Sequence, residues 1–182
     1  MPPVHSAPTG FTIRAFGPDE VENAASALAA VLLDCVAGGA SVSFMADLTR
    51  EQAEAFWRGV AEAARQDKRS VLVAEDSEGI VGVVEVIPAG PDNQPHRADI
   101  AKMLVHHRGR RRGLAEALLH AAESAAAAMG KTLLVLDTVT GGDAERLYTR
   151  LGWTRVGVIP DYALFPDGRP CDTTVFYKRV GA

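Results

Sequence analysis

The segment from Arg110 to Ala115 combines three arginines with a glycine and precedes an apolar, helix-forming run. Main-chain N–H groups at the start of a helix lack partners and lie at the positive end of the helix dipole. Such groups bind anions, and a pyrophosphate fits them well. Gly113 has no side chain and Ala115 has a small one, so a ligand can approach the main chain closely. The turn therefore predicts a phosphate-binding site, to which the neighbouring guanidinium groups add positive charge.

Arg108 and the three arginines of this turn also suit a basic patch that touches nucleic acid. Two features argue against that interpretation: the net charge of -4 and the lack of aromatic residues among the arginines. We therefore expect no nucleic-acid partner and no attraction to a membrane surface. The neighbouring His106 and His107 are adjacent, so they do not share a helix face as paired zinc ligands would. We predict no metal site.

The composition also limits the domain organisation. Apolar residues make up 47% of the 182, which is enough for a sizeable core, and none of the apolar runs reaches the roughly 18–20 residues that span a bilayer. Cys35 and Cys171 are far apart and form no CxxC pair, which predicts neither a disulfide framework nor a zinc site and favours a cytoplasmic location. We expect residues 1–10, with their three prolines, to be a flexible tail and residues 11–182 to be a single domain.

Hydrophobic patterns predict the elements that must position the turn. Thr49 and Gln52 form a capping box at the start of one helix, and the apolar run 132–138 is typical of a strand buried on both faces. We expect strands at residues 11–16, 70–75, 80–87, 97–105, 132–138, 154–159 and 173–179, and helices at 19–36, 50–66, 113–129 and 144–151. This order predicts an α/β fold with a mixed sheet.

The arrangement Arg110-x-x-Gly113-x-Ala115, following a strand, resembles the acetyl-coenzyme A signature of the GNAT acetyltransferases. The segment Ala144–Trp153 resembles a second motif of that family, Ala-x-x-Leu-Tyr-x-x-x-Gly-Phe, with Trp in place of Phe. The resemblance implies a GNAT-like fold, α/β or α+β, with a mixed, mostly antiparallel seven-stranded sheet flanked by about four helices. It also implies an acetyltransferase with acetyl-CoA as its cosubstrate.

The resemblance further assigns cofactor contacts to main-chain groups of the strand Met103, Leu104 and Val105, and to the turn residues Arg110, Arg111, Arg112, Gly113, Leu114 and Ala115. An N–H group of the strand would stabilise the tetrahedral oxyanion. Tyr148 would protonate the departing thiolate, since a positioned phenol can hand over a proton as the C–S bond breaks. Gly141 departs from the family pattern because many members carry Asn there, so one side-chain contact to the cofactor is missing or comes from elsewhere.

An alkylamine is almost fully protonated at neutral pH, so acetyl transfer to an amine needs a base. Glu85 lies, by strand alternation, on the same face as Val83, and Asp137 ends the apolar strand, where ligands gather in such folds. Apolar surroundings would raise the pKa of either carboxyl group and make it a better base. Glu85 has the alternative of a solvated sheet face, and Asp137 that of a turn cap. Asp99 is a weaker candidate because Arg97, on the same face, would neutralise it.

The segment 157–178 is similar to the branch that contains tabtoxin-resistance acetyltransferases, whose members acetylate a small, amino-acid-like β-lactam. Tyr162 and Phe165 flank a turn there and either wall the acceptor pocket or cover the sheet edge. The leading hypothesis is acetyl transfer to the amine of a small molecule, an amino-acid-like toxin or antibiotic included. The alternatives are a protein or peptide N-acetyltransferase and a coenzyme A-binding sensor without turnover. We expect a monomer or a homodimer.

Overall fold

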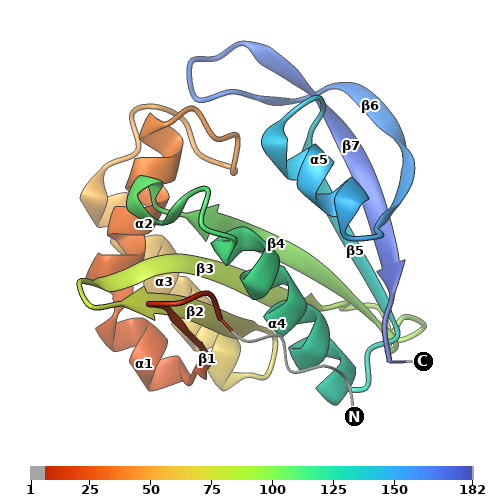
Figure 1. Ribbon diagram of the computed structural model, residues 1–182, viewed down its shortest axis with the longest axis horizontal. Helices are drawn as coiled ribbons and strands as arrows, with labels where there is room; N and C mark the ends of the chain where they lie inside the picture. Colours follow the sequence, from red (N-terminus) through yellow and green to blue (C-terminus); the bar gives the residue numbers. More distant parts are fainter. Residues whose placement is uncertain (1–6, 182) are drawn as a thin grey trace.

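A seven-stranded sheet forms the centre of the computed structural model, which describes residues 7–181 (Figure 1). Its strands are β1 Thr12–Phe16, β2 Ser70–Asp76, β3 Gly79–Pro88, β4 Arg97–Val105, β5 Leu133–Val139, β6 Thr154–Leu164 and β7 Pro170–Arg179. The helices are α1 Pro18–Asn23, α2 Ala25–Ala37, α3 Arg50–Arg65, α4 Leu114–Ala128 and α5 Asp143–Arg150, with a 3-10 turn, η1, at His107–Gly109.

The strand order is β1-β2-β3-β4-β5-β7-β6. Neighbouring strands run antiparallel except for β4 and β5, which are parallel. The predicted mixed, mostly antiparallel seven-stranded sheet is therefore confirmed. No helix within residues 7–181 has both the length and the apolar character needed to cross a membrane.

The predicted helix at 19–36 is in fact two helices, so the described chain has five α-helices rather than about four. The break falls at Ala24, whose N–H still bonds to the carbonyl of Glu20 although Ala24 leaves the helical conformation. Val21 of α1 and Leu28 of α2 both lie in the core with no exposed surface. The run is rich in alanine, which favours a helix and also continues the apolar pattern. The hydrophobic pattern therefore does not reveal the bend.

The two faces of the sheet carry separate cores. The α4-side core joins α4 and α5 to the sheet, and its largest fully buried members include Leu114, Leu118 and Phe176. The α3-side core joins α1, α2 and α3 to β1–β4 and is centred on Trp57, which has no exposed surface. The predicted capping box of α3 is confirmed, since Thr49 Oγ1 accepts from Gln52 N–H at 3.2 Å and the Gln52 side chain accepts from Thr49 N–H at 2.9 Å.

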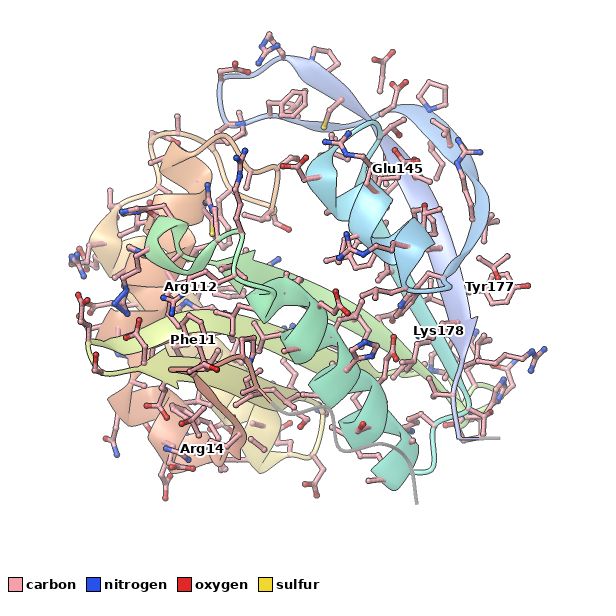
Figure 2. The ribbon with its side chains drawn as sticks, in the orientation of Figure 1. Phe11, Arg14, Arg112, Glu145, Tyr177 and Lys178 are labelled. Atoms are coloured by element: carbon pink, nitrogen blue, oxygen red, sulfur yellow. The ribbon has the colours of Figure 1, made fainter. Side chains whose placement is uncertain are left out.

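Helix α4 also connects the two arms of the sheet. Its residue Glu123 accepts hydrogen bonds from Trp153 Nε1 at 2.9 Å and from Lys178 Nζ at 2.8 Å. Lys178 belongs to β7, beside the lower part of α4 in Figure 2. These contacts hold β5 and β7 beside β4, although β4 and β5 share only three residue pairs.

The N-terminal segment is described from Ala7 onward, so residues 1–6 of the expected tail lie outside the described residues. Ala7 packs against the α4-side core, and Phe11 N–H bonds to the Pro8 carbonyl at 3.0 Å. The C-terminal hairpin is longer than expected, because β6 continues past Ile159 through a register shift to Leu164. An edge strand tolerates Pro160 because its N–H side needs no partner.

Candidate active site

Strands β4 and β5 separate after a short parallel contact. They pair only from Arg97 to Asp99 with Leu133 to Val135. Beyond these pairs β4 continues to Val105 and β5 to Val139, and the two strands diverge (Figure 1). We call this region the β4–β5 fork. The β4 edge of the fork keeps main-chain N–H and C=O groups that no strand takes up, as an extended ligand needs for pairing.

A bulge in β4 lies within the fork. Leu104 pairs with Val83 whereas Ala101 pairs with Glu85, so β4 has one more residue than β3 between these pairs. Lys102, in this bulge, has a positive φ of 48°. Bulges of this kind redirect side chains and are common beside active sites. The bulge immediately precedes the strand residues 103–105 for which we expect main-chain contacts to the cofactor.

The predicted phosphate-binding turn leads into α4 as expected. Gly113 is the N-cap of α4 and adopts a left-handed conformation with φ of 77°, which glycine reaches without strain. Gly113 is exposed, whereas Leu114 directly after it is almost fully buried in the α4-side core. The first main-chain N–H groups of α4 have no carbonyl partner within the helix, as at any helix start, and an exposed glycine precedes them, which is a setting that suits a phosphate group.

The arginines of the turn have different partners. Arg110 Nε donates to a main-chain carbonyl of β4 at 3.0 Å, and the guanidinium of Arg112 lies 4.2 Å from the ring centre of Phe11. Arg112 and Phe11 are labelled near each other in Figure 2. Arg108 donates to two main-chain carbonyls of β3. Arg111 is exposed, and within residues 7–181 no other group pairs with it. Three of these four guanidinium groups thus contact other parts of the protein, so we expect any phosphate contact to depend mainly on the backbone.

Asp34, near the end of α2, fixes the start of the turn. Its carboxylate accepts from His107 N–H at 2.8 Å and lies 2.5 Å from His107 Nδ1. His106 Nε2 lies 3.7 Å and Arg110 3.6 Å from the same carboxylate. Burial acts against the charged form of Asp34, but the hydrogen bonds from His107 prevail and lower the pKa of the carboxyl group. The two histidines are thus tied to an aspartate, a partner that their sequence context did not reveal.

Tyr148 comes from α5 and is the buried residue of that helix. Its ring packs near Trp153 and Phe176, with centroid distances of 5.9 and 6.0 Å. Burial, with a contribution from the charge of Asp137, raises the pKa of Tyr148 to about 12. Within residues 7–181, no group hydrogen-bonds to its hydroxyl. Tyr148 therefore stays protonated at physiological pH, with its hydroxyl free for a ligand.

Gly141 stands just before α5, where the resemblance leads us to expect Asn. Its φ is 79°, its N–H bonds to Glu145, and its carbonyl accepts from Arg146 at 3.0 Å. Glycine and asparagine are the residues that most readily adopt this left-handed conformation. The substitution therefore keeps the backbone of the loop and removes only a side-chain amide.

The two candidate bases lie in different environments. Glu85 has no exposed surface and is paired with Arg69, while its Oε1 has no hydrogen-bond partner. Burial is the main effect on Glu85 and raises the pKa of its carboxyl group, against the opposing charges of Arg69 and Lys102. Asp137 is exposed at the β5 edge of the fork. Neighbouring protein atoms nevertheless partly desolvate the Asp137 carboxyl group, which raises its pKa. The positive charge of Lys102 opposes this effect.

Asp137 and Asp99 lie on the same side of the sheet. Ala98, Ile100 and Leu136 pack into the α4-side core, so the residues that alternate with them face the α3 side. Arg97 lies 2.5 Å from a carboxylate oxygen of Asp99, as expected for a neutralising pair. The apolar strand predicted to be buried on both faces is therefore buried on one face only, because β5 borders the fork there.

The loop between α2 and α3 meets the β6–β7 hairpin. Ser41 Oγ donates to the Leu164 carbonyl at 2.7 Å, and Ala46 N–H donates to the Pro166 carbonyl at 3.0 Å. A hollow of about 480 Å³ lies beside these contacts and is lined in part by Phe165. Tyr162, by contrast, is exposed on the edge strand. The structure thus brings Phe165 to the hollow beside the α2–α3 loop and leaves Tyr162 at the sheet edge, so whether either residue walls an acceptor pocket stays a prediction.

Sequence reasoning missed three polar residues of this region. Arg69 pairs with Glu85, Lys102 donates to Ser43 on the α2–α3 loop at 3.1 Å, and Asp34 anchors the turn. Two of them had a detectable signal. Asp34 interrupts an apolar helix face and Lys102 interrupts an apolar strand. A charged residue inside an apolar element is uncommon unless it has a partner or a role.

The structure thus combines a mixed sheet that forks between two parallel strands, a helix that starts at an exposed glycine, and a buried tyrosine. A fold of this kind does not by itself identify a function. Residues 67–155 match the family model described as "Acetyltransferase (GNAT) domain". This range runs from just before β2 to the start of β6 and includes the fork, the turn and Tyr148. Over this range, just under half of the chain, the protein is similar to the GNAT acetyltransferases.

Solved structures with the same fold cover nearly the whole chain. The yncA protein of Salmonella typhimurium, with acetyl-CoA, superposes with a TM-score of 0.76 at 21% identity over 94% of both chains. A ribosomal-protein-alanine N-acetyltransferase from Brucella melitensis gives a TM-score of 0.77 at 22% identity, covering 93% of this chain and 99% of that one. RimL, a ribosomal L7/L12 α-N-protein acetyltransferase in complex with coenzyme A, gives 0.78 at 17% identity, covering 97% and 98%.

Proposed function

We propose that the protein transfers the acetyl group of acetyl-CoA to the amine of a small molecule, in the cytoplasm. The β4–β5 fork carries this proposal, because it offers a free strand edge, a helix N-terminus and a protonated tyrosine to a single ligand. The pantetheine arm would pair with the main chain of Met103, Leu104 and Val105, and the diphosphate with the N–H groups from Gly113 to Ala115. Similar folds named for acetyl-CoA or coenzyme A support this cosubstrate.

In the proposed reaction, the neutral amine nitrogen attacks the thioester carbonyl carbon and a main-chain N–H of the fork stabilises the oxyanion. The C–N bond forms, the C–S bond breaks, and the amine proton leaves. Asp137 is our choice for the base because it is exposed at the fork and its pKa is raised, so that it binds a proton more readily than an ordinary carboxylate. Glu85 remains the second candidate, but its burial against Arg69 limits access to an amine.

Tyr148 would act on the departing sulfur. Its pKa of about 12 means that complete proton transfer to a thiolate, whose conjugate acid has a pKa of about 8.5, is uphill. We therefore assign to the Tyr148 hydroxyl a hydrogen bond that strengthens as negative charge builds on the sulfur. The thiolate is then protonated from solvent or from the proton that the base removed, so one proton leaves the nitrogen and one reaches the sulfur.

A small acceptor is favoured by the contacts between the α2–α3 loop and the β6–β7 hairpin. These two segments are joined by hydrogen bonds at Ser41 and Ala46, and the joined segments restrict the path that an extended peptide would need on this side. The two ribosomal-protein acetyltransferases of similar fold keep a peptide acceptor as the alternative. At identities of 17% and 22%, these neighbours indicate the fold and not the acceptor.

The deciding experiment measures thiol release from acetyl-CoA with two panels of acceptors, small amines and short peptides. We expect release with small amines and loss of release when Gly113 is replaced. Release with peptides alone would favour the peptide alternative. Coenzyme A binding in calorimetry without release in either panel would identify a sensor.

A further inference from the structure

The α3 side of the fork carries six charged side chains, three of each sign. Four of them form two pairs, Arg69 with Glu85 and Arg97 with Asp99. Lys102 and Asp137 are the remaining cation and anion. Within residues 7–181, neither of these two has an opposite charge within ion-pair distance. Each nevertheless affects the pKa of the other, so the two charges lie near each other without contact.

The Lys102 ammonium does not form an ion pair with Glu85 in the described structure, although each of the two charges affects the pKa of the other. Glu85 Oε1 is buried and has no hydrogen-bond partner, yet the Lys102 ammonium donates to Ser43 Oγ at 3.1 Å. The ammonium also lies 5.8 and 5.6 Å from the ring centres of Phe44 and Phe56. Two aromatic rings and a hydroxyl thus surround a cation on the acceptor side of the fork.

The backbone is strained at both ends of the Lys102–Ser43 contact. Ser43 has a φ of 77° and Lys102 a φ of 48°, and neither residue is glycine. Such conformations are unfavourable for residues other than glycine and concentrate at functional sites, where the surrounding structure enforces them. Here they direct a hydroxyl and an ammonium to one point from two separate elements, the α2–α3 loop and the β4 bulge.

We propose that Lys102, with Ser43, holds a carboxylate group of the acceptor while Asp137 faces its amine. The acceptor is then a zwitterion that carries an ammonium and a carboxylate, with apolar atoms beside Phe44 and Phe56. This inference rests on the proposed acetyl transfer and adds the chemical class of the acceptor. Lys102 is a specificity residue because it contacts a part of the acceptor that does not react.

The test compares matched acceptors that differ only in the carboxylate, namely a set of L-amino acids and their carboxamides. We expect the parent protein to acetylate the acids with the higher kcat/KM. Lys102→Met keeps the length of the side chain and removes its charge. It should lower kcat/KM for the acids by about 10- to 100-fold, mainly through KM, because a hydrogen bond to a charged group is lost. Activity on the carboxamides should change little.

The control variant is Lys68→Met, which removes an exposed lysine whose Nζ bonds to Gln66 at 2.7 Å. It should leave both acceptor sets unaffected. Lys102→Glu should reverse the preference toward the carboxamides. Calorimetry with coenzyme A verifies that each variant is folded, and Ser43→Ala, with a smaller loss on the acids only, gives a second and milder probe.

The outcomes separate the inference from the proposed function. Equal losses on acids and carboxamides in Lys102→Met, or parent activity confined to amines without a carboxylate, would overturn the role of Lys102 and leave acetyl transfer standing. Absence of thiol release with every amine and amino acid tested would instead overturn the proposed function itself.

Discussion

On the α4 side of the fork, the groups ready to hold a ligand are main-chain amides at the start of a helix, whereas on the α3 side they are charged side chains. Gly113 represents the first kind, and Lys102 and Asp137 the second. Main-chain binding needs only a small residue and a helix start, so a short spacing of residue types reveals it. Side-chain binding depends on residues from several elements that meet only after folding.

The difference also affects how each side tolerates change. On the α4 side most substitutions leave the amides in place, and only a side chain at the glycine blocks them. On the α3 side, each charge is one member of a set, and removing one leaves an opposite charge less well compensated. We therefore expect one large effect on cofactor binding and several graded effects on turnover.

The largest expected effect follows from Gly113→Val. Gly113 has a φ of 77°, so a β-branched side chain would strain the turn and cover the free N–H groups. Loss of two charge-assisted hydrogen bonds to the diphosphate should weaken coenzyme A binding by about 1,000-fold, as measured by calorimetry.

The matched control is Gly130→Val, just beyond the other end of α4. Gly130 has a φ of 73°, and a Cβ there would meet nothing within 4 Å. Both variants should lose about 1–2 kcal/mol of unfolding free energy from backbone strain. Only the Gly113 variant should lose coenzyme A, and equal affinities in the two would remove the turn from the cofactor site.

Asp137→Asn should lower kcat/KM by about 100-fold or more at neutral pH, the usual contribution of a general base. In the parent, kcat/KM should fall as the pH drops through the raised pKa of Asp137, because a protonated carboxyl group cannot accept the amine proton. The asparagine variant should lack this acidic limb. Coenzyme A affinity should remain at the parent value.

The stability of the same variant should change in the opposite direction. A carboxyl group whose pKa is raised by folding stabilises the protein below its unfolded pKa, and that contribution disappears as the pH rises through the folded value. The charge of Asp137 is thus unfavourable to folding at pH 7, and Asp137→Asn should melt at a slightly higher temperature.

If Glu85→Gln rather than Asp137→Asn removes the acidic limb of the kcat/KM profile, the base is Glu85.

Tyr148→Phe should lower kcat by about 10- to 100-fold, because one hydrogen bond to a developing thiolate is lost. The phenyl ring keeps its place beside Trp153 and Phe176, so coenzyme A affinity and melting temperature should remain near the parent values. An unchanged kcat at every pH, with chemistry shown to be rate-limiting by single-turnover kinetics, would contradict the assigned role.

Much of the fold follows from local patterns, and the fork shows why the rest does not. The strand 97–105 and helix α3 agree with expectation to within about a residue, the helix because a capping box and an apolar stripe mark it in the sequence. The run 132–138 predicted burial on both faces because its residues are apolar. Only the face of Leu134 and Leu136 is fully buried; Leu133 and Val135 on the other face are half-buried, and Asp137 is exposed beyond the last pair with β4. The hydrophobic pattern of a strand does not distinguish a face that other parts of the protein bury from a face that stays open.

The site divides in the same way. Gly113 and Tyr148 were predicted because their motifs are local in sequence; the structure places Gly113 at the N-cap of α4 and Tyr148 buried in α5, and their roles stay predictions. Lys102 was missed because its role depends on two residues that only folding brings near it. Ser43 lies 59 residues earlier, on the α2–α3 loop, and Glu85 lies on the neighbouring strand β3. Long-range pairs of this kind leave no spacing to detect in one sequence.

The smallest expected effect concerns Asp34, which connects the two sides because α2 supplies it and the phosphate-binding turn receives it. Asp34→Asn keeps the size of the side chain and an oxygen for His107 N–H, but it loses the charge that faces His107 and Arg110. The turn should then be held less firmly, and KM for acetyl-CoA should rise by about 3- to 10-fold, the value of a partly exposed ion pair. Since the hydrogen bonds from His107 lower the pKa of Asp34, its own carboxylate stays charged throughout a normal assay range. Asp92→Asn, on the exposed β3–β4 loop, is the control. If Asp34→Asn instead changed the acceptor preference and left KM for acetyl-CoA unchanged, Asp34 would act on the α3 side. That result would contradict the division of roles between the two sides of the fork.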